Sequence, residues 1–138
     1  MNDAAFEVQK ERVRAVFNRW RNVLGLDEWE VTLNYHDGEY VKKDGSGSTR
    51  ALGLTYVEWE YRRATIDFRC DMLEDEDDDE LEYCFVHEAM HVLLNGQRAM
   101  REAGDSVGRE YERLFEEHTA TSLARAFIRA RNADKETA

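Results

Sequence analysis

This chain of 138 residues contains no proline, only 2 cysteines and no long uninterrupted run of apolar side chains. No apolar run approaches the roughly 20 residues that span a bilayer, which argues against membrane insertion. Residues 1–10 lack a basic segment followed by an apolar one, so no secretory signal is visible. Cys70 and Cys84 can both be free thiols. Together these features predict a cytoplasmic protein with no membrane association.

Basic residues are also few beside acidic ones. The chain has 19 Lys and Arg against 30 Asp and Glu, a net charge of −11. This balance argues against nucleic-acid binding through a broad basic surface. The acidic run at residues 71–82 lacks the glycine and the spacing of an EF-hand. We expect it to stabilise the start of the helix that follows, because acidic side chains there complement the helix dipole.

Length and composition predict one α+β domain covering residues 1–138. Hydrophobic residues make up 42% of the chain and charged residues 36%, as in globular proteins. Apolar residues recur at intervals of three and four over residues 6–24, which predicts a helix that ends at Gly25. Alternating apolar residues predict strands at 29–35, 52–57 and 64–70. Residues 36–50, rich in glycine and polar side chains, are expected to form a loop.

The second half of the chain is predicted to be helical. A helix is expected over residues 81–94, ending at Asn95 and Gly96, and a longer one over 109–131. We place the turn of a hairpin at residues 58–63, between the second and third strands. The expected fold is therefore an N-terminal helix, a three-stranded and mainly antiparallel sheet, and two further helices.

The sequence His87-Glu88-Ala89-Met90-His91 lies within the first of these two helices. Residues four apart share one helix face, so His87 and His91 can direct two imidazole nitrogens at one metal ion. Glu88 lies beside them and can take a proton from water at the metal. The pattern H-E-x-x-H is typical of zinc hydrolases. Apolar residues on both sides of it indicate a buried helix, in which imidazoles need polar partners.

A catalytic zinc ion needs a third protein ligand in addition to the two histidines. The candidates are Glu116, Glu117 and His118, which lie together on the last predicted helix. Helical geometry alone leaves the choice open, since Glu116 shares a face with Ala120, Leu123 and Phe127.

The chain resembles the gluzincin-type zinc metallopeptidases, most closely their small single-domain members in phages and bacteria. In that clan a downstream helix supplies a Glu ligand that is often followed at +4 by Asp or Asn. Here Glu117 is followed at +4 by Thr121 and at +6 and +7 by Leu123 and Ala124. The resemblance implies a minimal zincin-like fold in which His87, His91 and Glu117 bind Zn²⁺.

The same resemblance implies hydrolysis of a peptide or protein substrate by a metal-activated water, with Glu88 as general base. Tyr83, Arg109 and Tyr111 are candidates for the oxyanion donor. The strand at residues 52–56 is expected to be an edge strand that can hold a peptide. The alternative function is a non-catalytic zinc-binding or protein-interaction module that retains this fold. Residues outside the motif are given structural roles: His36 at the surface, and Cys84 in the core.

Overall fold

The computed structural model describes the backbone of residues 1–101 and 106–137; within these ranges the side chains of 96–101, 106–109, 111, 112, 115 and 135–137 are not described. The protein is α+β, as expected. Its helices and strands are α1 (Asp3–Trp20), β1 (Glu30–His36), β2 (Gly53–Glu58), β3 (Arg63–Arg69), α2 (Cys70–Leu73), α3 (Asp78–Arg101) and α4 (Ser106–Thr137). Two 3₁₀ turns, η1 (Leu26–Glu28) and η2 (Trp59–Tyr61), complete the order. None of the helices in these ranges is long and apolar enough to cross a membrane.

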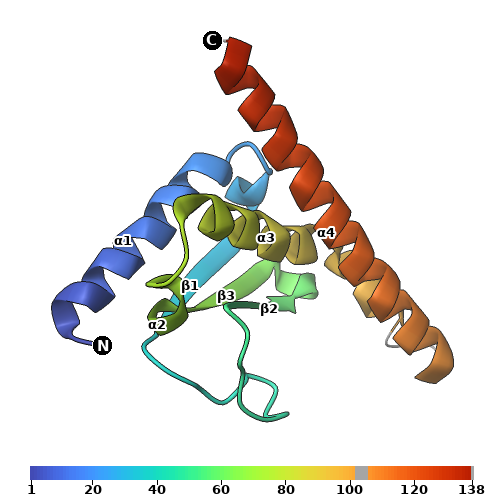
Figure 1. The fold of residues 1–138 in the computed structure, drawn as a ribbon. Coiled ribbons are helices and arrows are strands. Elements are labelled where there is room, and N and C mark those ends of the chain that lie inside the picture. The colour runs from blue at the N-terminus through green and yellow to red at the C-terminus, as the bar shows by residue number, and fades with distance from the viewer. Residues whose placement is uncertain (102–105, 138) are drawn as a thin grey trace.

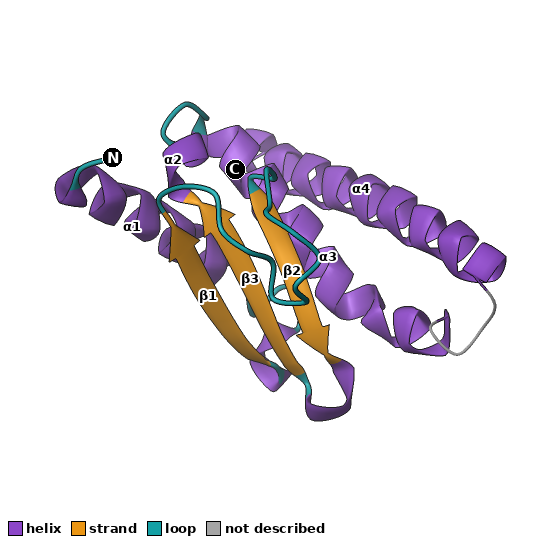
Figure 2. Ribbon diagram, turned by 90° about the horizontal axis from the view of Figure 1, so that it is seen from below, coloured by secondary structure: helices purple, strands orange, loops and turns teal. Residues whose placement is uncertain are grey.

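The three strands form a mixed sheet in the order β1-β3-β2. β2 and β3 form the expected antiparallel hairpin, closed by η2 and by Arg62, whose φ is 51°. The expectation of a mainly antiparallel sheet is wrong, because β1 pairs with β3 in parallel. The long connection 37–52 allows this arrangement, since it returns the chain across the sheet before β2 begins (Figure 2). β3 therefore occupies the centre, with buried side chains on both faces.

The helices cover one face of this sheet, and the connection 37–52 covers the other. α1 and α3 cover one face, and α4 packs against α3 (Figure 1). Phe85 of α3 joins the two sides of the core, because its ring contacts Phe17 of α1 and Phe68 of β3 at centroid distances of 5.9 and 6.4 Å. The connection 37–52 crosses the other face (Figure 2), where Thr49 is 1% exposed. Both faces of β3 are thereby removed from solvent.

α3 is longer at both ends than its apolar pattern predicts. It begins at Asp78 because the side chain of Asp77 accepts a hydrogen bond from the backbone N–H of Glu80, 2.8 Å away. Acidic residues fill its first turn, as expected of the run before the motif. The predicted end at Gly96 is wrong, since the helix continues to Arg101. A glycine in a helix costs only about 0.5–1 kcal/mol, which packing against α4 can offset.

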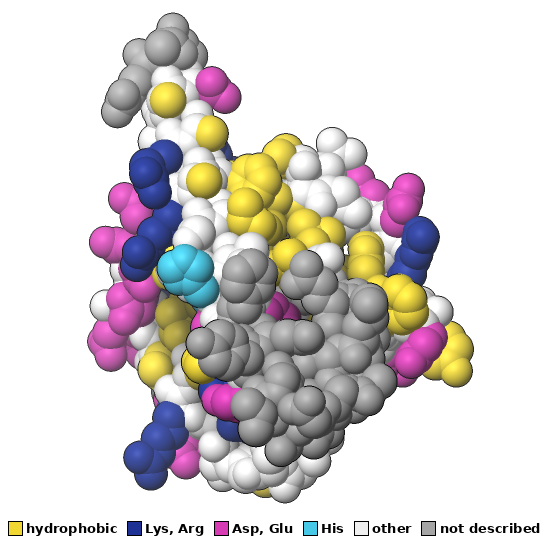
Figure 3. Space-filling view, turned by 90° about the vertical axis from the view of Figure 1, so that its right-hand side faces the viewer, with side chains coloured by type: hydrophobic (Ala, Val, Ile, Leu, Met, Phe, Trp, Pro, Cys, Tyr) yellow, Lys and Arg dark blue, Asp and Glu magenta, His cyan; other side chains and the backbone are white. Residues whose placement is uncertain are grey.

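α4 buries only part of the face that contains Glu116, Ala120, Leu123 and Phe127. Leu123 and Phe127 are 37% and 39% exposed, whereas Ala120 and Ala124 are fully buried. Small side chains at the contact allow the axes of α3 and α4 to approach closely. Hydrophobic side chains remain visible along α4 and on the adjoining body (Figure 3).

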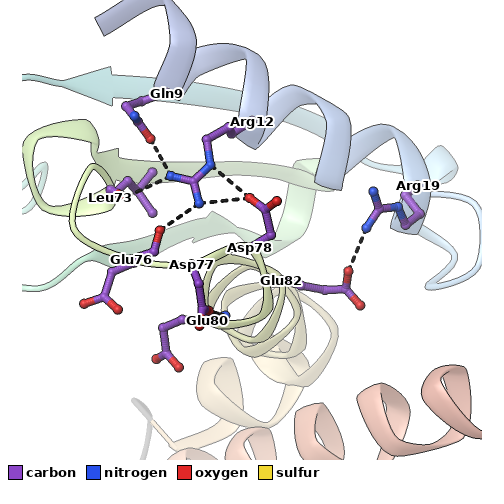
Figure 4. A network of polar contacts seen from close by, with 9 residues as sticks. All are labelled: Gln9, Arg12, Arg19, Leu73, Glu76, Asp77, Asp78, Glu80 and Glu82. Atoms are coloured by element: carbon purple, nitrogen blue, oxygen red, sulfur yellow. Dashed lines mark hydrogen bonds and ion pairs between the residues drawn. The ribbon is translucent and has the colours of Figure 1, made fainter. Parts of the chain in front are cut away.

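Arg12 of α1 connects that helix to the start of α3 (Figure 4). Its guanidinium donates to the backbone oxygens of Leu73 and Glu76, at 2.9 and 2.8 Å, and to the carboxylate of Asp78 at 3.0 Å. Nearby, Glu82 of α3 pairs with Arg19 of α1 at 2.7 Å. The basic residues of α1 are thus not only a solvated face. They fix the position at which α3, the helix with the histidine motif, enters the fold.

We expect Arg12→Met to lower the free energy of unfolding by about 2 kcal/mol, because it removes several charge-assisted bonds and leaves two backbone oxygens without their donor. Arg14→Met is the matched control on the same helix. The Arg14 side chain is 40% exposed, pairs with Glu11 and lies over the Tyr35 ring at 5.5 Å, but it donates to no backbone oxygen in the described part of the chain, so its loss should stay below about 1 kcal/mol. Urea unfolding of both variants measures the difference. Equal losses would contradict the role given to Arg12.

Candidate metal centre

α3 presents His87, Glu88 and His91 as one cluster. The Nε2 atoms of the two histidines lie 3.3 Å apart. One candidate ligand atom from each of the three residues falls within 4.8 Å of the others. The histidine side chains keep 15% and 17% of their surface exposed, so they lie at the border between core and solvent. The helix therefore brings the motif together as the spacing predicts.

Glu117 of α4 completes this cluster. One of its carboxylate oxygens lies 2.8 Å from Nε2 of His87, and the other lies 3.1 Å from Nε2 of His91. Of the three candidates on α4, Glu117 is the one whose carboxylate lies at the point where both Nε2 atoms meet. His118, the third candidate, is exposed.

Glu116 lies behind His91 rather than at this meeting point. It is 4% exposed, and its carboxylate is 3.2 Å from Nδ1 of His91. Thr121 has the corresponding position behind His87, with its hydroxyl 3.4 Å from Nδ1 of that ring. Each histidine therefore has a partner on α4 at its rear nitrogen. Such partners fix the orientation and the tautomer of histidines that bind metals.

These contacts concentrate electron pairs at one point. A carboxylate can only accept, so Nδ1 of His91 carries the hydrogen that Glu116 receives. In the neutral ring, the Nε2 lone pair then faces Nε2 of His87 and the carboxylate of Glu117. A proton or a metal ion at this point would remove the repulsion between the Nε2 lone pair of His91 and the Glu117 carboxylate. Two imidazoles and a carboxylate are ligands that Zn²⁺ prefers, and tetrahedral zinc–nitrogen bonds of about 2.0–2.1 Å place neighbouring ligand atoms about 3.3 Å apart.

Comparisons with protein-family models, curated proteins and solved structures give no match to this chain. The geometry of the described residues therefore carries the functional argument by itself.

The negative groups around His91 also determine its affinity for a proton. Burial lowers the pKa of His91, but the hydrogen bond to Glu116 and the charges of Glu88 and Glu117 outweigh it, so the pKa is raised. The same groups that attract a proton attract a metal cation. A metal ion bound at this ring would therefore compete with a proton for it.

Glu88 is held by β2 rather than by the histidines. The hydroxyl of Thr55 lies 2.5 Å from Oε2 of Glu88 and 3.1 Å from its backbone oxygen. Burial raises the pKa of the Glu88 carboxyl, although the Thr55 bond and the neighbouring histidines lower it in part. Glu88 thus retains a proton at higher pH than an exposed glutamate does. A carboxylate with a raised pKa is suited to taking up and releasing a proton near neutral pH.

Gly53 gives α3 room to approach β2 at this place. A Cβ atom on Gly53 would lie 3.0 Å from Sγ of Cys84 and 3.2 Å from Cγ of Glu88. Cys84 is half-buried and packs against the core, and burial raises the pKa of its thiol. This agrees with the structural role expected of Cys84. The sequence reasoning missed Gly53 and Thr55, because only the packing of β2 against α3 gives them their role.

A cleft of about 840 Å³ opens beside the cluster. Its lining includes all of β2, the motif residues His87, Glu88 and His91, and Glu117 of α4. The sheet order places β2 at an edge, as expected, and among the described residues β3 is its only strand partner. An edge strand with free backbone groups thus borders the candidate metal centre.

The other predicted residues lie in varied places. The centroids of the Tyr83 and His87 rings are 5.9 Å apart, so Tyr83 lies near the candidate metal centre. The side chains of Arg109 and Tyr111 lie outside the described residues. His36 is not a surface residue as expected: it is half-buried, lies 2.8 Å from the Asp67 carboxylate and stacks on Tyr40 at 3.6 Å. It anchors the beginning of the connection 37–52.

Proposed function

We propose that this protein is a zinc-dependent peptidase of the gluzincin type, with a zincin-like fold. His87, His91 and Glu117 would hold the zinc ion, and Glu88 would act as the general base. The observation that carries the proposal is the convergence of three ligand atoms from two helices on one point, with a separate buried carboxylate beside it. A purely structural site has no need of that additional acid.

The residues around the cluster have distinct tasks in this proposal. Zinc, when bound, supplies a Lewis acid that polarises the scissile carbonyl and lowers the pKa of water at the site. Thr55 holds Oε2 of Glu88, which leaves Oε1 to accept the proton of the attacking water. The raised pKa of Glu88 helps it keep that proton until the leaving amine takes it. Glu116 and Thr121 keep the imidazoles oriented from behind.

The cleft favours an extended peptide as the substrate. A peptide can pair with the free edge of β2, since the backbone groups along that edge are available for hydrogen bonding. Thr55 lies on β2 beside Glu88, so a chain paired there passes close to the general base. The same edge would also serve a non-catalytic module that captures peptides. Hydrolysis is therefore the measurement that separates the two functions.

Metal removal tests the proposal directly. The zinc-loaded protein should cleave members of a library of unstructured decapeptides, detected by mass spectrometry. Dialysis against a chelator should abolish cleavage, and one equivalent of zinc should restore it. Zinc should also raise the melting temperature, because a ligand bound only by the folded state stabilises it. Stoichiometric zinc without hydrolysis would favour the non-catalytic module, and absence of zinc binding would refute both.

A further inference from the structure

Asn95 is the exception among the buried polar side chains. Eight polar or charged residues are buried in the described part of the chain. Seven of them have a hydrogen-bond partner for the side chain: Gln9, Thr49, Thr65, Asp67, Glu82, Glu88 and Glu116. The side-chain amide of Asn95, 6% exposed, has no partner among the described residues.

Asn95 lies where its amide can reach an occupant of the cleft. It lies on α3 four residues after His91, on the same side of the helix, and it lines the cleft that contains the histidines. In the described part of the chain, the enclosed side-chain atoms that lack a hydrogen-bond partner belong to Trp20, Tyr40 and Arg131, so the amide of Asn95 is not sealed in the core but opens to the cleft. An amide that opens to the cleft without a partner in the described part of the chain is available to bond water or an occupant of the cleft.

The chemistry of the amide indicates the group it binds. A carboxamide offers two N–H donors and one carbonyl acceptor, the complement of a peptide group. It carries no charge, so it does not select for a charged side chain. The main chain of a substrate peptide is therefore the partner that fits.

The distance along α3 locates this contact on the peptide. Thr55 of β2 contacts Glu88, and η2, which follows β2, packs against α3, so strand and helix advance in the same direction. Four helical residues advance about 6 Å, whereas an extended chain advances about 3.3 Å per residue. Asn95 then lies about two peptide residues from the position of His91.

We propose that Asn95 is a substrate-positioning residue that binds the main chain about two residues from the bond cleaved. This inference rests on the proposed peptidase function. It assigns to α3, beyond the histidine motif, a second task of fixing the register of the peptide in the cleft.

The test compares Asn95→Leu with wild type on the peptide that the library shows to be cleaved best. Removal of one or two hydrogen bonds should raise KM about tenfold with kcat little changed. In a second series, an N-methyl group is placed on each peptide nitrogen in turn. With the wild-type protein, we expect a similar rise in KM when the methyl group is at one position, two residues from the scissile bond. At that position Asn95→Leu should lose nothing more, because the contact is already absent. Leu93→Ala, on the same helix, is the matched control. It should remain as sensitive as wild type to N-methylation at every position.

Stability gives a readout that a structural role would not reproduce. Replacing an amide that opens to the cleft by a side chain of similar shape should leave the melting temperature and the zinc content unchanged. The affinity of the same peptide for zinc-loaded Glu88→Gln, measured by calorimetry, should fall about tenfold when Asn95→Leu is added. An unchanged KM and affinity in a protein that cleaves peptides would overturn the inference alone. Absence of cleavage by the zinc-loaded wild type would overturn the proposed function, and this inference with it.

Discussion

Glu88→Gln is expected to abolish peptide hydrolysis while zinc remains bound. The amide has the size of the carboxylate and can still accept the hydrogen bond from Thr55, so the packing of α3 against β2 should persist. It cannot take up a proton under these conditions. General-base catalysis contributes roughly 10²–10⁴-fold, and kcat should fall by at least that lower figure with KM little changed. Two measurements check this. Steady-state kinetics give kcat and KM for a peptide selected from the library, and mass spectrometry gives the zinc content.

Glu80→Gln is the control for this substitution. Glu80 lies in the first turn of the same helix with its side chain exposed, away from the cluster. Glu80→Gln removes a carboxylate from α3, as Glu88→Gln does. Any general effect of charge on zinc binding or on substrate attraction therefore appears in both variants. We expect its kcat to stay within about twofold of wild type. If Glu88→Gln retained more than a tenth of the wild-type kcat, another group would have to act as the base.

The histidine motif could be predicted from the sequence because it depends on one helix. Spacing of four residues determines that His87 and His91 share a face, whatever else the chain does. Glu117 required more, since its place depends on how α4 packs. The resemblance to the gluzincin pattern indicated it, whereas the apolar pattern of α4 favoured the face of Leu123 and Phe127. Of that face the structure buries Ala120 but leaves Leu123 and Phe127 partly exposed, and α4 packs through Ala120 and Ala124; this close approach brings Glu117 to the histidines.

The sheet order could not be predicted in the same way. Alternation identifies a strand and the face it buries, but it does not name the neighbouring strand. The pairing of β1 with β3 depends on where the connection 37–52 crosses, and the contact between His36 and Asp67 depends on that same crossing. Asp67 alternates with apolar residues as if it were exposed. It is buried because the connection covers its face of the sheet, which no local pattern shows.

The clearest test of the ligand set compares Glu117→Gln with Glu116→Gln. Both residues lie near His91, but they stand on opposite sides of its ring. Glu117 reaches Nε2, where a metal ion would bind, and Glu116 reaches Nδ1 behind it. Loss of a partner behind a ligating histidine typically weakens metal binding about 10–100-fold. We expect Glu116→Gln to fall in that range and Glu117→Gln to lose more, because it removes a ligand charge directly.

Zinc affinity measured by competition with a chromophoric chelator gives this order, with His87→Ala as the variant that should lose stoichiometric zinc altogether. Thermal unfolding supplies an independent measurement of zinc affinity. At a concentration 100 times its dissociation constant, zinc should stabilise the wild type by about 2.7 kcal/mol. A variant that no longer binds zinc should lose this increment, and unfolding without metal measures the effect of the substitution itself. If Glu116→Gln bound zinc more weakly than Glu117→Gln, Glu116 would be the ligand. This result would also require the His91 ring to flip or α4 to turn when the metal binds, because in this structure Glu116 faces Nδ1 of His91 and not Nε2.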